Sequence, residues 1–253
     1  MKQIINYRNM FFCICILVFM HTSNIVADFS FSLVDNTINL GKGKLSTTAQ
    51  VKNTGNYPVA ISLSILSKYQ DLYGNESNEL VEEPIFLIYP ERLILMPGET
   101  ELIKIGWIGP IDLNKELAFR AVCEEKSLAN NKPEDRKQSF TSGKITFLTK
   151  YALNLFIKVK DSKTELTLEN TEFYEKEGDT WVRFTLKNTG NGILKGNALQ
   201  FFLPNKKTKN DIIFNHSLFY VYPGDTRRFE YRVRQNKNDL TTNSRFTYEL
   251  QNL

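Results

Sequence analysis

Residues 51–56, Val-Lys-Asn-Thr-Gly-Asn, decide the fold, because nearly the same stretch returns as Leu-Lys-Asn-Thr-Gly-Asn at residues 186–191. A second motif follows each copy, Met-Pro-Gly-Glu-Thr at 96–100 and Tyr-Pro-Gly-Asp-Thr at 222–226. In both copies a strand-like run enters the Asn-Thr-Gly-Asn turn, and the Pro-Gly turn begins another strand. Proline fixes φ at the first central turn position, and glycine supplies the positive φ of the second. Two motifs that recur in the same order indicate two copies of one domain.

The sequence around these turns is typical of short β-strands. Alternating, β-branched and aromatic residues fill runs that Gly, Asn, Pro or Asp interrupt, and long amphipathic helical patterns are absent. The clearest expected strands are 29–33, 46–51, 59–65, 101–107, 118–123 and 181–186. This pattern predicts an all-β chain with two immunoglobulin-like β-sandwich domains in tandem, residues 28–159 and 160–253. Both are near the ~100-residue size of such a sandwich.

Residues 1–27 have the features of a signal peptide. Lys2 and Arg8 give a positive start, residues 11–20 are apolar, and the small residue Ala27 ends the segment. An apolar stretch this short does not cross a bilayer as a stable anchor. We therefore expect cleavage after Ala27 and export to the periplasm, without stable insertion into the membrane. A retained N-terminal anchor is the alternative.

Removal of this segment changes the charge and the set of reactive residues. The formal net charge falls from +4 to +2, because two basic residues and no acidic ones are lost, which gives no case for nucleic-acid binding. Cys13 and Cys15 leave as well, so Cys123 has no partner for an internal disulfide. His216 is then the one remaining histidine. Histidine metal sites and Ser-His-Asp or Cys-His catalysis need several convergent partners, so we expect no enzyme and no metal or cofactor.

The most informative strand pattern spans residues 144–158, Lys-Ile-Thr-Phe-Leu-Thr-Lys-Tyr-Ala-Leu-Asn-Leu-Phe-Ile-Lys. Alternate strand residues point to opposite faces. One face is therefore a nearly continuous apolar row: Ile145, Phe147, Thr149, Tyr151, Leu153, Leu155 and Ile157. At ~3.3 Å per residue the strand would extend over roughly 45–50 Å, more than one small domain needs. Either it is the last core strand of the first domain and continues into the linker, or its N-terminal half pairs with a partner by β-strand addition.

With this strand included, the chain resembles the periplasmic chaperones of chaperone–usher pilus assembly, the PapD-like proteins, over nearly all of the mature sequence. The residues that carry the resemblance are 50–55, 90–99, 103–105, 116–120 and 144–158. Their order and spacing together make the resemblance specific. The Phe-Arg pair at 119–120 and the Ile-x-Phe-x-x-Lys-Tyr pattern at 145–151 are most similar to the archaic, non-classical branch.

This resemblance implies a function. In the family, a pilus subunit is an incomplete sandwich, and the chaperone completes and caps it with a strand of its own until an outer-membrane usher inserts the next subunit. The implied partners are therefore pilus subunits and the usher. The implied donor-strand residues are Ile145, Phe147, Thr149 and Tyr151. In the free protein, a self-capping dimer would cover the same apolar edge.

The resemblance also implies a basic anchor for the C-terminal carboxylate of the subunit, formed by Arg120 and Lys150. Arginine offers a carboxylate a planar fork and lysine a compact charge. Many members carry another basic residue on the first strand, but Asp-Asn-Thr stands at the matching residues 35–37. Arg120 could instead be a structural arginine and Lys150 a solvated one. Glu116 is a candidate for domain packing rather than for ligand binding.

A structural or adhesive surface protein made of tandem immunoglobulin-like domains is the alternative function. A pilus subunit would be a single incomplete domain with an N-terminal donor extension. This sequence instead predicts two complete domains and has its apolar row at 145–157, in the middle of the chain. The position of the row therefore favours a chaperone.

Overall fold

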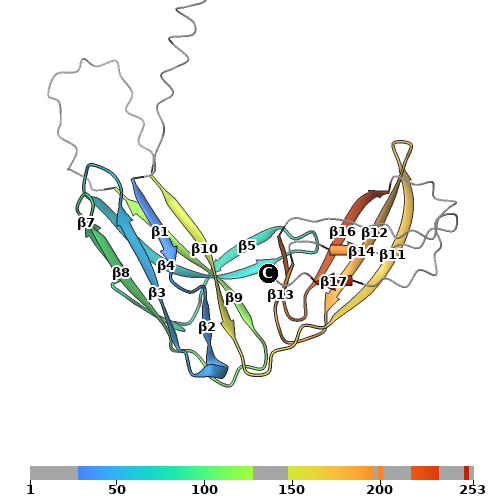
Figure 1. Cartoon of the computed structure of the whole chain (residues 1–253), viewed down its shortest axis with the longest axis horizontal. Helices are drawn as coiled ribbons and strands as arrows, with labels where there is room; N and C mark the ends of the chain where they lie inside the picture. The colour runs from blue at the N-terminus through green and yellow to red at the C-terminus, as the bar shows by residue number, and fades with distance from the viewer. Residues whose placement is uncertain (1–27, 128–147, 197–198, 202–217, 234–247, 251–253) are drawn as a thin grey trace, which may run out of the picture.

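The computed structural model describes residues 28–127, 148–196, 199–201, 218–233 and 248–250. Figure 1 shows two β-domains set at an angle, the first built from β1–β10 and the second from β11–β17. The six short strands expected at 29–33, 46–51, 59–65, 101–107, 118–123 and 181–186 are present, and the prediction of an all-β fold is confirmed. In the described part of the chain no helix is long and apolar enough to cross a membrane. The predicted signal peptide, residues 1–27, lies outside the described residues.

The first domain is a sandwich of two sheets. One sheet has the order β1-β3-β8-β6, and the other has the order β2-β10-β9-β4-β5 with β7 also paired to β4. A 3-10 turn, η1 (Leu40–Lys42), follows β2. The strands are β1 (Phe29–Leu33), β2 (Thr37–Asn39), β3 (Ser46–Asn53), β4 (Val59–Gln70), β5 (Glu76–Leu80), β6 (Phe86–Tyr89), β7 (Arg92–Leu95), β8 (Thr100–Trp107), β9 (Leu117–Lys126) and β10 (Lys150–Lys158).

Alternation along these strands builds the core of the first domain. Every second side chain of β3 and of the first half of β4 is buried between the sheets, as the two-residue period of a strand requires. The largest fully buried side chains of this core are Phe29, Ile38, Ile61, Leu63, Leu95, Ile103, Ile105, Leu155 and Ile157. Strands β9 and β10 therefore turn their odd-numbered residues inward and their even-numbered residues outward.

The second domain has a smaller core of the same kind. Its sheet has the order β11-β12-β16, and β13 pairs with β15 and β14 with β17. Phe184, Phe219 and Phe229 lie at the centre of the core. The strands are β11 (Leu166–Lys176), β12 (Asp179–Asn188), β13 (Leu194–Gly196), β14 (Leu199–Phe201), β15 (Phe219–Val221), β16 (Thr226–Val233) and β17 (Tyr248–Leu250).

The repeated Asn-Thr-Gly-Asn turns make the same hydrogen bonds in both domains. Asn53 and Asn188 are fully buried. Each side-chain amide donates to two carbonyl oxygens, Asn53 to those of Tyr57 and Leu95 at 2.7 and 2.9 Å, and Asn188 to those of Gly192 and Val221 at 2.8 and 2.9 Å. The backbone carbonyl oxygen of the same asparagine accepts the backbone amide of the glycine in the Pro-Gly turn, at 3.1 Å for Gly98 in the first domain and 2.9 Å for Gly224 in the second. The two sequence motifs are thus halves of one structural unit, which supports the duplication.

We expect Asn53→Ala and Asn188→Ala each to lower the free energy of unfolding by about 2–4 kcal/mol, because two buried or partly buried carbonyl oxygens lose their donor. Urea unfolding followed by circular dichroism measures the change. Asn56→Ala, at an exposed position of the same turn, is the matched control and should stay within about 0.5 kcal/mol of the wild type. Equal, small effects for all three variants would contradict this account of the turn.

An apolar cluster and a buried carboxylate join the two domains. Phe156 of β10 packs against Tyr220 and Tyr222 of the second domain, with ring centroids of Phe156 and Tyr220 5.5 Å apart. Beside this cluster Glu116 is buried, and its Oε2 accepts the amide of Ile193 at 2.7 Å. The interpretation of Glu116 as a domain-packing residue is therefore confirmed.

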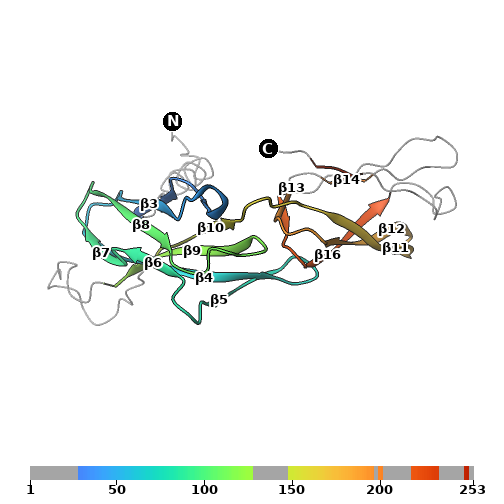
Figure 2. The same cartoon turned by 90° about the horizontal axis from the view of Figure 1, so that it is seen from below.

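The β4–β5 hairpin forms a second link between the domains. Both views show it extending from the first domain towards the second (Figure 1, Figure 2). At its tip the carbonyl oxygen of Leu72 accepts the amide of Arg228 at 2.7 Å, and the guanidinium of Arg228 lies 5.7 Å from the ring centroid of Tyr73. Strand β5 is thereby placed at the boundary between the domains.

Candidate functional site

Strand β10 has one side open over most of its length. Residues 150–157 pair with β9, whereas β2 covers the other side only at residues 156–158. No strand of the described part pairs with that other side at residues 150–155. Even-numbered residues aim their amides to this side, as Phe156 does when its amide donates to Asn36 O at 2.8 Å. The backbone of residues 150–155 can therefore accept one more strand.

The beginning of β10 falls later than the predicted start at residue 144. The strand begins at Lys150, after Leu148 and Thr149. Contact with β9 nevertheless extends back by one residue, because Thr149 O accepts the amide of Glu125 at 2.9 Å. Leu148 is exposed. The predicted donor residues Ile145 and Phe147 lie outside the described residues.

From Tyr151 onward, the apolar row of β10 packs on the core of its own domain. The Tyr151 hydroxyl donates to Phe29 O at 2.9 Å, and the two rings meet edge to face with centroids 5.0 Å apart. Leu153 packs against the same core, and Leu155 and Ile157 are fully buried within it. The first domain thus uses the apolar row from Tyr151 to its end.

Cys123 provides a reporter of the β9–β10 pairing. It lies directly opposite Tyr151 of β10, it is a free thiol within the described residues, and burial raises its pKa to about 12. We expect the native thiol to react with a disulfide reagent at least ~100-fold more slowly than an ordinary cysteine, since the thiolate is the reactive form. The measurement uses Cys13→Ser, Cys15→Ser protein, with denaturant restoring full reactivity. Rapid labelling of the folded protein would show that this strand pair opens.

A group of polar residues gathers where the outward face of the β9–β10 sheet meets the second domain. Arg120 of β9 lies opposite Asn154 of β10 and pairs through Nη2 with Glu76 of β5. The second oxygen of Glu76 lies 2.6 Å from Nζ of Lys68 on β4. One carboxylate therefore bridges two cations. We call Lys68, Glu76, Arg120, Asn154, Tyr220 and Tyr222 the inter-domain cluster.

Lys68 is the buried centre of this cluster. Its side chain has no exposed surface, and Nζ donates to Asn154 Oδ1 at 2.7 Å. Nζ also lies 5.1 and 5.8 Å from the ring centroids of Tyr220 and Tyr222, which is within the range of a cation–π interaction. Burial lowers the pKa of Lys68, and the positive charge of Arg120 acts in the same direction, while the hydrogen bond to Glu76 opposes both.

Lys150 lies in a different, more exposed group. Its Nζ is 2.5 Å from Glu124 Oε1, and Lys126 holds the other oxygen of Glu124 at 2.7 Å. These two lysines lower the pKa of Glu124 to about 2. The Lys150 side chain is 57 % exposed.

The structure does not bring Arg120 and Lys150 together. Lys150 lies opposite Glu124, and Asn154 lies opposite Arg120, so four residue positions separate the two basic residues along the paired strands. At ~3.3 Å per residue this is about 13 Å. They share the outward face of the sheet, but each is paired with a different carboxylate, Arg120 with Glu76 and Lys150 with Glu124.

Sequence reasoning missed Lys68, the cation that does lie beside Arg120. Its sequence signal is weak: Lys68 has the same alternation phase as Ser62, Ser64 and Leu66 on the outward face of β4. Only the pairing of β4 with β9, which sets Leu66 opposite Arg120, places it near the arginine. A lysine in a strand is ordinarily solvated, so the sequence alone does not distinguish it.

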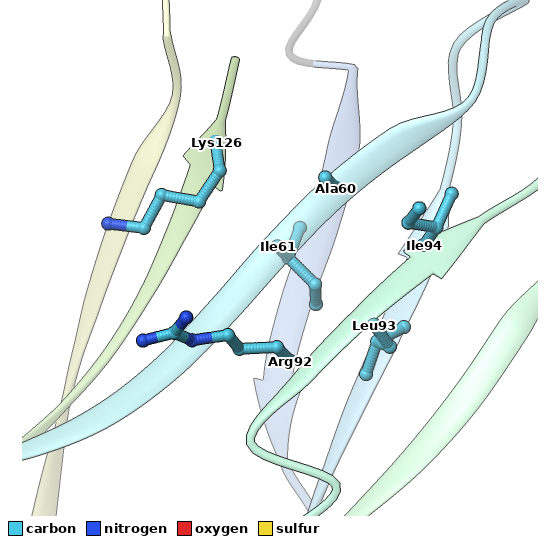
Figure 3. A pocket seen from close by; sticks show the side chains of 6 residues that line it. All are labelled: Ala60, Ile61, Arg92, Leu93, Ile94 and Lys126. Carbon is cyan, nitrogen blue, oxygen red and sulfur yellow. The ribbon is translucent and has the colours of Figure 1, made fainter. Parts of the chain in front are cut away.

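A shallow pocket lies farther along the same sheet, between β4 and β7. Figure 3 shows its apolar floor, with the charged ends of Arg92 and Lys126 reaching to one side of it. The lining residues are Ala60, Ile61, Arg92, Leu93, Ile94 and Lys126. Among the described residues, no three His, Cys, Asp or Glu side chains are grouped to hold a metal ion.

Comparison with known proteins gives structural matches only. No family model and no curated protein matches the chain. Similar solved structures include the CsuC–CsuE chaperone–tip adhesion subunit pre-assembly complex from the archaic chaperone–usher Csu pili of Acinetobacter baumannii. That match has 16 % identity and a TM-score of 0.54, and it covers 87 % of this chain and 92 % of the other. The class 5 fimbriae chaperone CfaA matches with 13 % identity and a TM-score of 0.54, covering 87 % and 98 %.

A third structure, a chaperone–tip adhesin complex of CFA/I fimbriae biogenesis, matches with 13 % identity and a TM-score of 0.55, covering 87 % of this chain and 98 % of the other. The similarity therefore extends over nearly the full length of these chaperones and includes both domains. The predicted fold class, two β-sandwich domains in tandem, is confirmed. The chain has the fold of the periplasmic chaperones of chaperone–usher pilus assembly, the archaic branch among them.

Proposed function

We propose that this protein is a periplasmic chaperone that binds, completes and caps pilus subunits by donating a strand, and that delivers them to an outer-membrane usher. The observation that carries the proposal is the open side of β10 at residues 150–155. An unpaired strand edge is a template for pairing with another chain. Strand addition uses such an edge for main-chain hydrogen bonds and uses alternate side chains for specificity.

The donor residues in this proposal are Ile145, Phe147, Thr149 and Tyr151. Tyr151 already packs against Phe29, so it marks the point where the strand enters its own domain. The residues before it continue the same alternation toward the partner. Arg120 is the proposed anchor for the C-terminal carboxylate of the subunit, because its guanidinium is partly exposed on the outward face of the sheet, on the strand next to β10 and opposite Asn154. Lys150 contributes its charge nearer the donor residues.

The proposal is supported by structural neighbours that are pilus chaperones, some of them in complex with a tip subunit. Co-expression with a candidate pilus subunit tests it. Strand donation predicts a soluble 1:1 complex in the periplasmic fraction, measured by size exclusion with light scattering. A subunit that aggregates to the same extent with and without the protein would exclude a chaperone for that subunit.

A further inference from the structure

The inter-domain cluster contains a carboxylate of its own at the place where a partner's carboxylate would bind. Glu76 uses one oxygen for Lys68, at 2.6 Å, and the other for Arg120. A carboxylate with each oxygen on a different cation is the arrangement that a chain terminus would adopt between the same two groups. Glu76 therefore occupies the cation pair internally.

The three side chains are layered, with the anion outermost. The side chain of Lys68 is 0 % exposed, that of Arg120 is 16 % exposed and that of Glu76 is 31 % exposed. Glu76 thus covers the two cations from the solvent side. A ligand that arrives from solvent meets Glu76 first, and it reaches Lys68 only after Glu76 moves.

Strand β5, which carries Glu76, is well suited to move. Among the described strands it is the last of its sheet and pairs only with β4, and all five of its residues are exposed. The link of the β4–β5 hairpin to the second domain is made at the tip, through Leu72 and Tyr73, and not through β5 itself. Segments with few buried contacts open at a low free energy compared with the core. Displacement of Glu76 therefore leaves the packing of β4, β9 and β10 intact.

The cluster also has unused capacity for an anion. Among the described residues, these two cations share one carboxylate, which leaves one positive charge without a counter-ion in a mostly buried place and is unfavourable. The hydroxyl of Tyr222, a residue that is 7 % exposed, has no hydrogen-bond partner within the described part of the chain. A buried hydroxyl without a partner is unusual and marks a donor that a ligand could use.

We propose that Glu76 is a displaceable internal counter-ion, which holds the Lys68–Arg120 pair in the free chaperone and is replaced by the C-terminal carboxylate of a bound subunit. This inference rests on the proposed function and changes one of its details, since Lys68 and not Lys150 is the second cation of the anchor. The exchange of one carboxylate for another keeps Lys68 paired throughout, so no buried charge is left alone. It also makes the affinity for the subunit depend on how easily Glu76 leaves.

The first test needs no subunit. Glu76→Ala removes the internal carboxylate, and we expect its thermal midpoint to fall by roughly 4 °C, because Lys68 and Arg120 lose their shared counter-ion. Sodium acetate should restore at least half of this loss, whereas sodium chloride at equal ionic strength should not. Glu79→Ala, at an exposed position of the same strand, is the matched control and should show neither effect. The double variant Glu76→Ala, Arg120→Ala should lose the acetate effect.

If acetate and chloride act alike on Glu76→Ala, the cluster does not bind a free carboxylate and the inference is overturned. Should Glu76→Ala not fold, Glu76→Gln serves in its place, because the amide keeps the size and removes the charge. The same comparison of acetate with chloride then decides whether the cluster binds a free carboxylate.

The second test measures subunit binding by titration. We expect Glu76→Gln to bind the subunit about tenfold more tightly than the wild type. If Glu76 occupies the cation pair about nine-tenths of the time, the free fraction is about one-tenth, and the apparent affinity of the wild type falls by about tenfold. A wild type that binds the subunit, together with a Glu76→Gln variant that binds equally or more weakly, overturns the inference but not the chaperone function. A wild type without subunit binding removes the chaperone function for that subunit, and the acetate test still decides whether Glu76 occupies an anion site.

Discussion

Phe147→Asp abolishes the complex with a pilus subunit while the chaperone stays folded; this is the largest single effect that we expect. In the proposed complex the Phe147 side chain enters the apolar groove of the subunit. A carboxylate there would lose its hydration without a partner. We expect at least about a 1000-fold loss of affinity, which corresponds to ~4 kcal/mol. Co-purification of a tagged subunit measures the loss.

Leu148→Asp is the matched control for this variant. Leu148 is adjacent in sequence but belongs to the opposite alternation phase, and its side chain is exposed. The control should retain the subunit within about threefold, since a charge on a solvated face costs little. Thermal unfolding should be nearly unchanged for both variants, because the part of the row that packs in the described core of the domain begins at Tyr151. A complex that survives Phe147→Asp would exclude this residue from the donor strand.

Arg120→Ala is expected to have the second largest effect, a loss of about 2–5 kcal/mol in subunit affinity if the contact with the carboxylate is desolvated. This equals a factor of roughly 30 to 5000 in the dissociation constant. The fold should tolerate the change, because Glu76 keeps its pairing with Lys68. Titration of the subunit by calorimetry gives the affinity, and Arg120→Lys separates the role of the planar fork from that of the charge.

Lys150→Ala provides the comparison on the same face of the sheet. Its side chain is more than half exposed and paired with Glu124, so its removal should change the affinity by less than about fivefold. Normal co-purification of a subunit with both Arg120→Ala and Lys150→Ala would show that the carboxylate anchor lies elsewhere.

The domain duplication could be predicted from sequence because its determinants are short motifs. Asn53 and Asn188 each bond one carbonyl oxygen in their own turn and one beside the distant Pro-Gly motif, whose glycine amide bonds back to the same asparagine. Recurrence of both motifs therefore reflects recurrence of one hydrogen-bonded unit. The positions of strands such as 29–33 could be predicted equally well, because the alternation of apolar and polar residues in the sequence matches the alternation of buried and exposed side chains in a strand.

The candidate site could be predicted only in part, because it depends on register. Alternation correctly places Arg120 and Lys150 on one face, since a shift by two residues leaves a side chain on the same face. Such a shift nevertheless moves it about 7 Å along the strand. Alternation alone does not fix the register of β9 against β10, so the distance between Arg120 and Lys150 could not be predicted from the sequence.

The surroundings of Lys68 and Glu76 depend on contacts between distant parts of the chain, which a local sequence pattern does not show. Glu76 reaches Lys68 across the β4–β5 hairpin, and Tyr220 and Tyr222 close over the lysine only when the second domain docks. The sequence separation between Lys68 and these tyrosines exceeds a domain length. Contacts of this kind follow from the arrangement of the domains, which the sequence motifs do not specify.

Amide hydrogen exchange along β10 tests the central claim most directly, because the register divides its amides into two sets. In the free monomer the amides of Tyr151, Leu153 and Leu155 face β9, whereas those of Lys150, Ala152 and Asn154 face the open side. Residue-resolved exchange by NMR, with and without the subunit, should show the first set protected in both states. The second set should exchange rapidly in the free protein and become protected in the complex. Protection of Lys150, Ala152 and Asn154 already in the free monomer, or its absence in the complex, would contradict strand donation from this edge.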